Sequence, residues 1–424
     1  MGYVLKHGTI IGENTRLEQV DVLVEGNRIK QIGIDIDSTG HTLIDCTNLF
    51  ISPGFIDMHV HLREPGFEYK ETIESGSKAA AAGGFTTVAC MPNTRPATDN
   101  ADIVRFIIEQ ANKHGYARVL PIAAITAGQK GEELTDIPAL KEAGAVGLSD
   151  DGRGVQRADR MKRAMEIAKQ YDMPLIIHAE DETLSGKGCM NAGEAAERLG
   201  LPGIPDDAEA VMVARDIVLA EVTGAHLHVC HVSAKSVIEL IRYAKGRGLP
   251  VTGEVAPHHL LLTDDQIDPD NSDWKVNPPL RTKRDREACI EAFLDGTLDI
   301  VATDHAPHSV EEKQKPFTEA PFGMVGLEIA FPLMYTHFVK TGRMTLNELV
   351  DRMATRPAKL FKLQGGRIQP GEPADLTVLD LHATKVIDPA SFLSKGKNTP
   401  FAGQKAQGWP VLTMVDGVVS FDAR

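Results

Sequence analysis

The stretch FIDMHVH, residues 55–61, is an apolar run of strand length that ends in two histidines. It is the first of eight such runs, and longer stretches of helical character separate them. This alternation is typical of βα units around a parallel sheet, so eight units predict an α/β fold with a closed (β/α)8 barrel of the TIM type. The predicted strands are residues 55–61, 85–91, 118–126, 145–151, 174–180, 226–232, 251–259 and 299–307.

Five of the intervals between these strands combine good helix formers with an apolar face, which predicts helices that pack on the barrel. The expected helices are residues 69–83, 100–115, 157–172, 206–224 and 233–248. The Pro-rich stretch 311–323, just after the eighth strand, predicts an ordered or lid-like loop.

The two ends of the chain have a different pattern from the middle. Residues 1–52 and 366–424 contain short β-rich runs that are separated by Gly, Pro, Asn and Asp, which is typical of strands joined by tight turns. We therefore expect both ends to combine in one small β-sandwich domain, while residues 53–365 form the catalytic barrel.

Composition excludes several classes of function. The 424 residues carry a formal net charge of −14, whereas nucleic-acid binding relies on clustered Lys and Arg; an anionic substrate would need a local cationic site. Five cysteines without CxxC spacing suit a reducing compartment, so a cytoplasmic protein is expected. Neither a signal peptide nor a run of roughly 18 apolar residues is found, so we expect no membrane partner.

Potential metal ligands occur at the ends of several predicted strands. The C-terminal ends of barrel strands carry the catalytic groups of such folds. His59 and His61 are two residues apart on one strand, so both imidazoles project from the same face. Histidine and carboxylate suit Zn²⁺ and similar divalent ions. The predicted ligands are His59, His61, Asp151, His178, His231 and Asp304.

Several neighbours of these residues leave alternatives open. Asp150 is the rival of Asp151, and periodicity does not separate the two. Asp57 is in phase with His59 and could orient a ligand through a hydrogen bond. Three further residues are expected to have packing roles: His226, His228 and Cys230.

Longer motifs extend along the whole barrel. They are GFIDMHVHLREPGFEYKE (54–71), MPNT (91–94), GLSDDG (147–152), HAE (178–180), CHVS (230–233), VNPPLR (276–281) and ATDHAPH (302–308). With these motifs the chain resembles bacterial type I dihydroorotases of the cyclic amidohydrolase superfamily. HxH and TDHAP mark the wider superfamily, whereas HLREPG followed by MPNT is much more specific to dihydroorotase-like proteins.

The resemblance implies two zinc ions per subunit. His59, His61 and Asp304 would bind one ion, His178 and His231 the other, and Asp151 would bridge them. Hydantoinases and dihydropyrimidinases, which share the fold, use a carbamylated lysine from the fourth strand as the bridge. The stretch AVGLSDD (145–151) contains no lysine, and this departure favours dihydroorotase.

The resemblance also implies a set of substrate contacts. These are His61, Arg63, Asn93, Asn277, His308, Phe322 and Gly323. The chemistry of Arg63 supports its role independently, because dihydroorotate carries a carboxylate and a guanidinium can bind a carboxylate through two parallel hydrogen bonds.

The implied reaction is the reversible hydrolysis of (S)-dihydroorotate to N-carbamoyl-L-aspartate, the third step of de novo pyrimidine (UMP) biosynthesis. A hydroxide that bridges the metals would be the nucleophile, and Asp304 the general acid and base. Two alternatives stay open: another cyclic amidase, such as an allantoinase or hydantoinase, and an inactive scaffold subunit for aspartate carbamoyltransferase. The family also implies a homodimer and a possible association with aspartate carbamoyltransferase.

Overall fold

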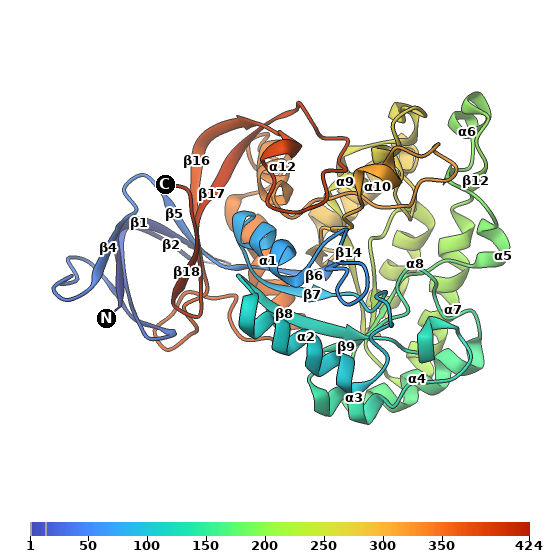
Figure 1. Ribbon diagram of the computed structural model, residues 1–424, viewed down its shortest axis with the longest axis horizontal. Coiled ribbons are helices and arrows are strands. Elements are labelled where there is room, and N and C mark those ends of the chain that lie inside the picture. The colour runs from blue at the N-terminus through green and yellow to red at the C-terminus, as the bar shows by residue number, and fades with distance from the viewer. Residues whose placement is uncertain (1, 13–14) are drawn as a thin grey trace.

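Eight parallel strands form the barrel that the sequence predicts (Figure 1). The computed structural model describes residues 2–12 and 15–424, so residues 1, 13 and 14 of the expected small domain lie outside the described residues. The barrel strands are β6 (Phe55–Val60), β7 (Phe85–Cys90), β8 (Arg118–Ala123), β9 (Gly147–Leu148), β10 (Leu175–Ile177), β13 (Leu227–Val229), β14 (Val251–Val255) and β15 (Ile300–Val301).

The strands pair in the order of the chain, from β6 to β15. A parallel bridge between Val60 and His305 brings the end of the sheet back to its beginning. The backbone N–H of His61 donates to the carbonyl of His305 at 2.8 Å across the same junction. The closure therefore lies directly beside the HxH pair.

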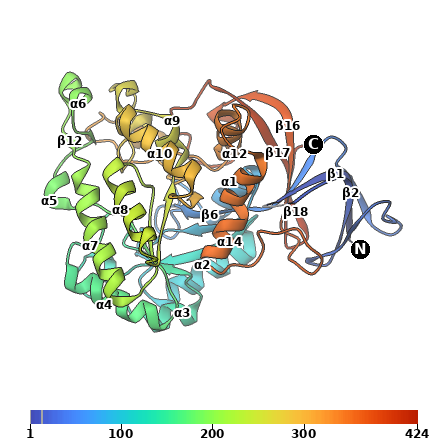
Figure 2. The same ribbon diagram turned by 180° about the vertical axis from the view of Figure 1, so that it is seen from behind.

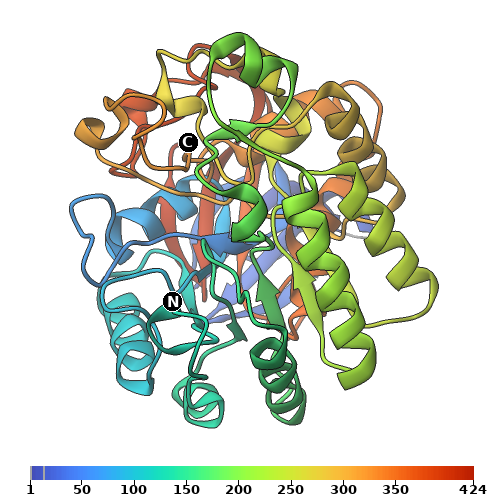
Figure 3. The ribbon, with the colours of Figure 1, turned by 90° about the vertical axis from the view of Figure 1, so that its right-hand side faces the viewer.

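Helices surround the strands, as Figures 2 and 3 show. All five predicted helices are confirmed, and two more fill the remaining intervals. The long helices are α1 (Ile73–Ala82), α2 (Ala101–His114), α3 (Ile137–Ala143), α4 (Ala158–Gln170), α7 (Asp207–Thr223), α8 (Lys235–Gly246) and α10 (Lys283–Asp295). Among the described residues, none of the helices is long and apolar enough to cross a membrane.

Shorter elements decorate the barrel. Between β10 and α7 lie α5 (Glu182–Ser185), β11 (Met190–Asn191), α6 (Glu194–Leu199) and β12 (Gly203–Ile204). After β14 and β15 come α9 (Pro257–Leu261), α11 (Val310–Lys313), α12 (Ala330–Met334), α13 (Leu346–Val350) and α14 (Arg356–Leu360).

Side-chain caps mark where some of these helices begin. The predicted helix 69–83 starts only at Ile73, because the Thr72 hydroxyl accepts from the backbone N–H of Ser75 and the Ser75 side chain caps the Thr72 backbone. In α2 the Asn100 side chain accepts from the second and third N–H groups of the helix. Both arrangements satisfy N–H groups that have no partner within the helix.

The chain ends combine in a separate sheet, as expected. Its strands are β1 (Tyr3–Gly12), β2 (Thr15–Glu25), β3 (Arg28–Gly33), β4 (Thr42–Asp45), β5 (Phe50–Pro53), β16 (Leu376–Val386), β17 (Lys405–Val415) and β18 (Val418–Asp422). The antiparallel pair β5–β16 joins the two ends of the chain in one hydrogen-bonded network. Residues from both ends fill its core, including Leu5, Val22, Ile51, Val378 and Leu412.

The connection between β16 and β17 leaves this sheet and packs on the barrel. Ile387 and Phe401 share an apolar cluster with Met324, Ile329 and Leu333, which follow the eighth barrel strand. Residues 387–404 thus bring part of the C-terminal segment to the rim of the barrel, although the sequence pattern had grouped them with the small domain.

Three aromatic rings join α12 to the start of the barrel, which makes Phe331→Ala a test of the packing. Phe331 stacks on Phe55 with ring centroids 5.1 Å apart, and Phe55 meets Phe85 edge-on at 5.8 Å. We expect the substitution to lower the free energy of unfolding by about 3–5 kcal/mol, because it leaves a cavity in the core. Urea denaturation measures the effect.

The matched control is Val418→Ala, since Val418 is 63% exposed. This change should alter stability by no more than about 0.5 kcal/mol. Equal losses for the two variants would contradict the packing argument.

Candidate metal centre and substrate cavity

The ends of the strands bring four imidazoles around the carboxylate of Asp151. The Asp151 oxygens lie 3.4 Å from His59 Nε2 and 3.7 Å from His61 Nε2. The oxygen nearest His59, Oδ1, also lies 3.8 Å from both His178 Nδ1 and His231 Nε2. At most 5% of any of these residues is exposed. Asp151 is therefore the shared member of two groups of potential ligands.

Asp304 completes this arrangement from the end of β15. Its Oδ1 lies 3.1 Å from His61 Nε2 and 3.5 Å from His59 Nε2. Asp304 and His231 both have positive φ, 48° and 32°, a conformation that costs energy for residues with a Cβ. Such strain is typical of functional sites, where the surrounding structure maintains it.

The donor atoms fit divalent metal ions. His59 Nε2 and Asp151 Oδ1 are buried, face each other and have no hydrogen-bond partner. Buried polar atoms in proteins are nearly always paired, so these two are explained if both donate electron pairs to a cation. Imidazole nitrogen and carboxylate oxygen are the ligands that Zn²⁺ and similar ions accept.

Two carboxylates that sequence analysis missed support the histidines. Glu254, from β14, lies 2.7 Å from His59 Nδ1, and Glu180 lies 3.2 Å from His178 Nε2. Each occupies the ring nitrogen that faces away from the centre, as carboxylates do around metal-binding histidines. Glu180 had a signal, because it is two residues from His178. Glu254 had none beyond its place in a predicted strand.

The structure separates the roles of two aspartates that the sequence left open. Asp150 accepts hydrogen bonds from the backbone N–H groups of Ile125 and Thr126, so it holds the preceding loop and does not face the centre. Asp57 accepts from the backbone of His59 and of Thr303. It therefore fixes the main chain beside two strand ends, while the His59 ring is held by Glu254.

Cys230 lies close to His59 and Glu254, and the three could form a separate ligand group. The hydrogen bonds disfavour this alternative, because His59 Nδ1 and both Glu254 oxygens are already engaged with one another or with other donors. Burial raises the pKa of the Cys230 thiol well above its ordinary value, which opposes the thiolate that a metal would need. The packing role expected for Cys230 agrees with this environment.

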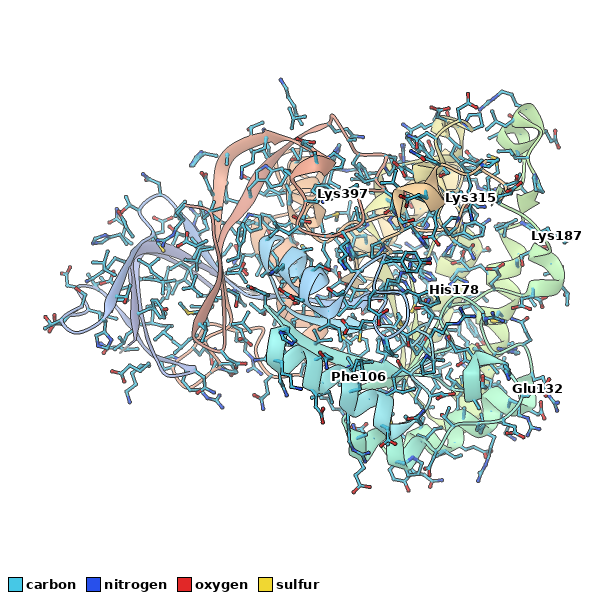
Figure 4. All side chains as sticks on the ribbon, viewed as in Figure 1. Phe106, Glu132, His178, Lys187, Lys315 and Lys397 are labelled. Atoms are coloured by element: carbon cyan, nitrogen blue, oxygen red, sulfur yellow. The ribbon has the colours of Figure 1, made fainter. Side chains whose placement is uncertain are left out.

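A cavity of about 150 Å³ opens over the centre. Every predicted substrate contact lines it, and so do all the predicted ligands except His59, which lies deeper. These lining residues are His61, Arg63, Asn93, Asp151, His178, His231, Asn277, Asp304, His308, Phe322 and Gly323. The sequence had not singled out two further lining residues, Gly152 and Ala306. Figure 4 shows His178 in the barrel half of the molecule, away from the sheet of the chain ends.

One side of the cavity is cationic, although the protein as a whole is acidic. Burial lowers the pKa of Arg63 to about 10, which leaves the guanidinium charged at neutral pH, and its Nε donates to the carbonyl of Pro307 at 3.2 Å. Burial and the nearby charges of Arg63 and Lys70 hold the pKa of His308 well below its ordinary value. His308 is thus a neutral imidazole beside a fixed positive charge.

Hydrogen bonds orient the His308 ring. Lys70 can only donate, and its Nζ lies 3.3 Å from His308 Nδ1, which must accept. Nε2 lies 3.2 Å from the Arg63 guanidinium and 2.8 Å from the carbonyl of Phe322. The carbonyl can only accept and is the shorter contact, which favours the ring proton on Nε2. Lys70 is a further residue that sequence analysis did not single out.

Two asparagines connect the cavity to the predicted ligands. Asn93 accepts from His61 Nδ1 at 2.8 Å and donates to Asp151 at 3.2 Å. Asn277 donates to Glu180 at 2.5 Å. Both predicted substrate contacts therefore also belong to the hydrogen-bond network around the histidines.

Asn398 lies in the connection between β16 and β17. It bonds to the backbone of three residues that line the cavity. Its amide donates at 3.0 Å to the carbonyls of both Ala306 and Gly323, and its oxygen accepts from the backbone N–H of His308 at 3.1 Å. No pattern in the sequence signals this role, because Asn398 is 90 residues from His308 along the chain.

Known proteins with similar sequences cover the whole chain. A family model described as dihydro-orotase-like matches residues 48–237. The dihydroorotase of Brevibacillus brevis is 54% identical over 424 residues, which is 99% of either chain. The dihydroorotase of Anoxybacillus flavithermus is 51% identical and covers 99% of this chain and 98% of its own.

The chain belongs to the dihydroorotase family.

Solved structures of related enzymes share this dihydroorotase architecture. The L-hydantoinase (dihydropyrimidinase) from Arthrobacter aurescens matches with a TM-score of 0.89 and 29% identity, over 100% of this chain and 97% of that one. The D-hydantoinase (dihydropyrimidinase) from Thermus sp. matches with a TM-score of 0.83 and 28% identity, over 99% and 95%. The protein is therefore an enzyme of the cyclic amidohydrolase type, with the TIM-barrel fold of that group.

The neighbouring aspartates provide a matched test of the metal centre. Asp151→Asn should weaken binding of divalent metal by more than about 100-fold, which exceeds the 10–100-fold typical of residues that only support a ligand. Asp150→Asn should retain its metal, because Asp150 bonds the loop backbone. Metal analysis after dialysis against a chelator measures both. Retention of metal by Asp151→Asn would exclude a central role for this carboxylate.

Proposed function

We propose that the protein is a zinc-dependent dihydroorotase. It would interconvert (S)-dihydroorotate and N-carbamoyl-L-aspartate, the third step of de novo pyrimidine (UMP) biosynthesis, in the cytoplasm. The observation that carries the proposal is the Asp151 carboxylate among four imidazoles, together with a cationic side of the cavity that opens over them.

Six residues would hold two zinc ions in this proposal. His59, His61 and Asp304 would bind one and His178 and His231 the other, with Asp151 between them. Bound there, the ions would lower the pKa of a water molecule and polarise the carbonyl of the substrate ring.

Arg63 would bind and orient the substrate. Its guanidinium faces the cavity with its charge largely shielded from water, and dihydroorotate offers a carboxylate that matches its fork. Asn93, Asn277, His308 and the backbone at Phe322–Gly323 supply donors and acceptors around the ring. A charged pair in a buried cavity is stronger than one at the surface, which accounts for an anionic substrate on an acidic protein.

Asp304 would move the proton. Its carboxylate lies at the cavity floor, where it would accept a proton from the attacking water and deliver it to the departing ring nitrogen. In the biosynthetic direction the same carboxylate would accept a proton from the attacking ureido nitrogen and deliver it to the departing hydroxide, which leaves as water.

The two other candidate functions receive less support. A hydantoinase or allantoinase shares the fold, but the loop after β9 carries Asp150 and Asp151 and no lysine. A scaffold subunit for aspartate carbamoyltransferase would not need six potential ligands gathered around an open cavity. The family resemblance supports two further proposals, which are a homodimer and an association with aspartate carbamoyltransferase.

The direct test is an assay of the purified protein with dihydroorotate, hydantoin and allantoin, before and after chelation. We expect turnover of dihydroorotate alone, its loss with the metal, and its return with added zinc. Preference for hydantoin or allantoin would reject the proposed substrate, and full activity after complete metal removal would reject the metal dependence.

Asp304→Asn tests the proton-transfer step. Loss of a positioned acid and base should lower kcat by about 10²- to 10⁴-fold. The variant must be compared with the original protein at equal metal content, since Asp304 also contacts His59 and His61. Near-normal interconversion by a folded, metal-loaded variant would exclude Asp304 from this role.

Arg63→Met tests substrate binding. We expect KM for dihydroorotate to rise about 10- to 100-fold, because a hydrogen bond to a charged group contributes about 1.5–3 kcal/mol. Arg95→Met is the matched control, since Arg95 is exposed near the same rim and should leave KM unchanged. Equal KM values for the two variants would exclude Arg63 from binding the carboxylate.

A further inference from the structure

A chain of hydrogen bonds runs through the barrel interior to the candidate metal centre. His226 Nε2 and His228 Nδ1 each lie 2.8 Å from the Thr252 hydroxyl. His228 Nε2 lies 3.0 Å from one oxygen of Glu254, and the other oxygen lies 2.7 Å from His59 Nδ1. Hydrogen bonds thus link five side chains from three strands or strand ends in series. Their order is His226, Thr252, His228, Glu254 and His59, and His59 is a predicted ligand.

The setting makes this chain unusual. The neighbouring side chains inside the barrel form an apolar cluster that includes Ile56, Met58, Ile176 and Ile300. Glu254 and His228 are each 0% exposed. Replacing buried ionic groups with apolar ones is often neutral or stabilising, so stability alone gives no reason for a carboxylate at this depth.

The chemistry of the groups sets the direction of the hydrogen bonds. Both oxygens of Glu254 lie within hydrogen-bond distance of groups that can donate: the His59 ring at 2.7 Å, the His228 ring at 3.0 Å and the backbone N–H of His231 at 3.2 Å. Such surroundings favour an ionised carboxylate. An ionised carboxylate only accepts, so both rings must donate to it. The proton of the His59 ring is then on Nδ1, and the lone pair of Nε2 faces Asp151.

The outer part of the chain follows from the same rule. A single proton on the His228 ring, placed on Nε2, satisfies Glu254 and leaves Nδ1 to accept from the Thr252 hydroxyl. The Thr252 oxygen then accepts from His226 Nε2. Burial lowers the pKa of His226 to about 4, so that ring is neutral and has one N–H to donate.

Glu254 also touches a second strand end. The backbone N–H of His231 donates to it at 3.2 Å. One carboxylate therefore receives three donors: the ring of His59, the ring of His228 and the main chain of His231. It therefore contacts one member of each group of potential ligands, His59 and His231.

We propose that Glu254 is a positioning residue for the metal centre, and that His228, Thr252 and His226 keep it in place. By accepting from His59 Nδ1, Glu254 fixes the ring with Nε2 toward the metal, and its charge makes that nitrogen a stronger ligand. The proposal rests on the proposed zinc-dependent function, because it assigns His59 to the metal.

Two variants separate the charge of Glu254 from its contact. Glu254→Gln keeps the size and an acceptor for His59 but removes the charge. Glu254→Asp keeps the charge but is one methylene shorter, so it withdraws from the ring. Asp216→Asn is the matched control, because Asp216 is a fully buried carboxylate on α7 that bonds Arg215.

The measurements are the zinc affinity, by competition with a chelator, and the free energy of unfolding with and without zinc. We expect both Glu254 variants to bind zinc about 10- to 100-fold more weakly, which removes about 1.4–2.8 kcal/mol of the stability that zinc confers. Stability without zinc should change far less. Asp216→Asn should bind zinc like the original protein.

Two outcomes would overturn the proposal: unchanged zinc affinity in both Glu254 variants, or equal losses of stability with and without zinc, as a purely structural role requires. If the original protein binds no zinc, the proposed function fails first, and the two failures are distinguishable.

A measurement on the unsubstituted protein covers the case in which neither variant folds. ¹⁵N NMR of the zinc-bound protein should find the His59 proton on Nδ1 and the metal on Nε2. The opposite arrangement would overturn the proposal.

Discussion

The structure around the barrel rim depends on one electrostatic constraint, which is the burial of the Asp151 carboxylate among four imidazoles. A carboxylate in this position is costly unless cations or donors surround it, and its Oδ1 has no hydrogen-bond partner. Divalent metal ions would satisfy that oxygen and the facing nitrogen of His59 together. Several strand ends converge on this point, and two of the residues there, His231 and Asp304, have positive φ.

The cavity over this centre depends on a part of the chain outside the barrel. Asn398 holds the backbones at Ala306, His308 and Gly323, and its segment is anchored where Glu328 accepts from the backbone N–H groups of Leu393 and Ser394. The small sheet of the chain ends thus contributes to the cavity through a loop. Its presence is part of how the site is built.

Much of the fold was available from local sequence. Each of the eight apolar runs contains a barrel strand, and each expected helix is present, because apolar periodicity reports burial directly. Strand ends were predicted less well: residues 145–151 contain a strand of only two residues, Gly147–Leu148. Beyond this strand Asp150 accepts from the backbone of Ile125 and Thr126, and Asp151 faces the centre.

The sequence by itself determined the barrel, the pairing of chain ends in one sheet and the set of histidines and carboxylates at the strand ends, since these depend on periodicity and on short motifs. Only the tertiary structure distinguished Asp151 from Asp150, placed Glu254 behind His59 and brought Asn398 to His308. These relationships join residues that are far apart along the chain or have equal local signals. Hydrogen bonds of this kind are decided by how strands close into a barrel, and periodicity carries no information about them.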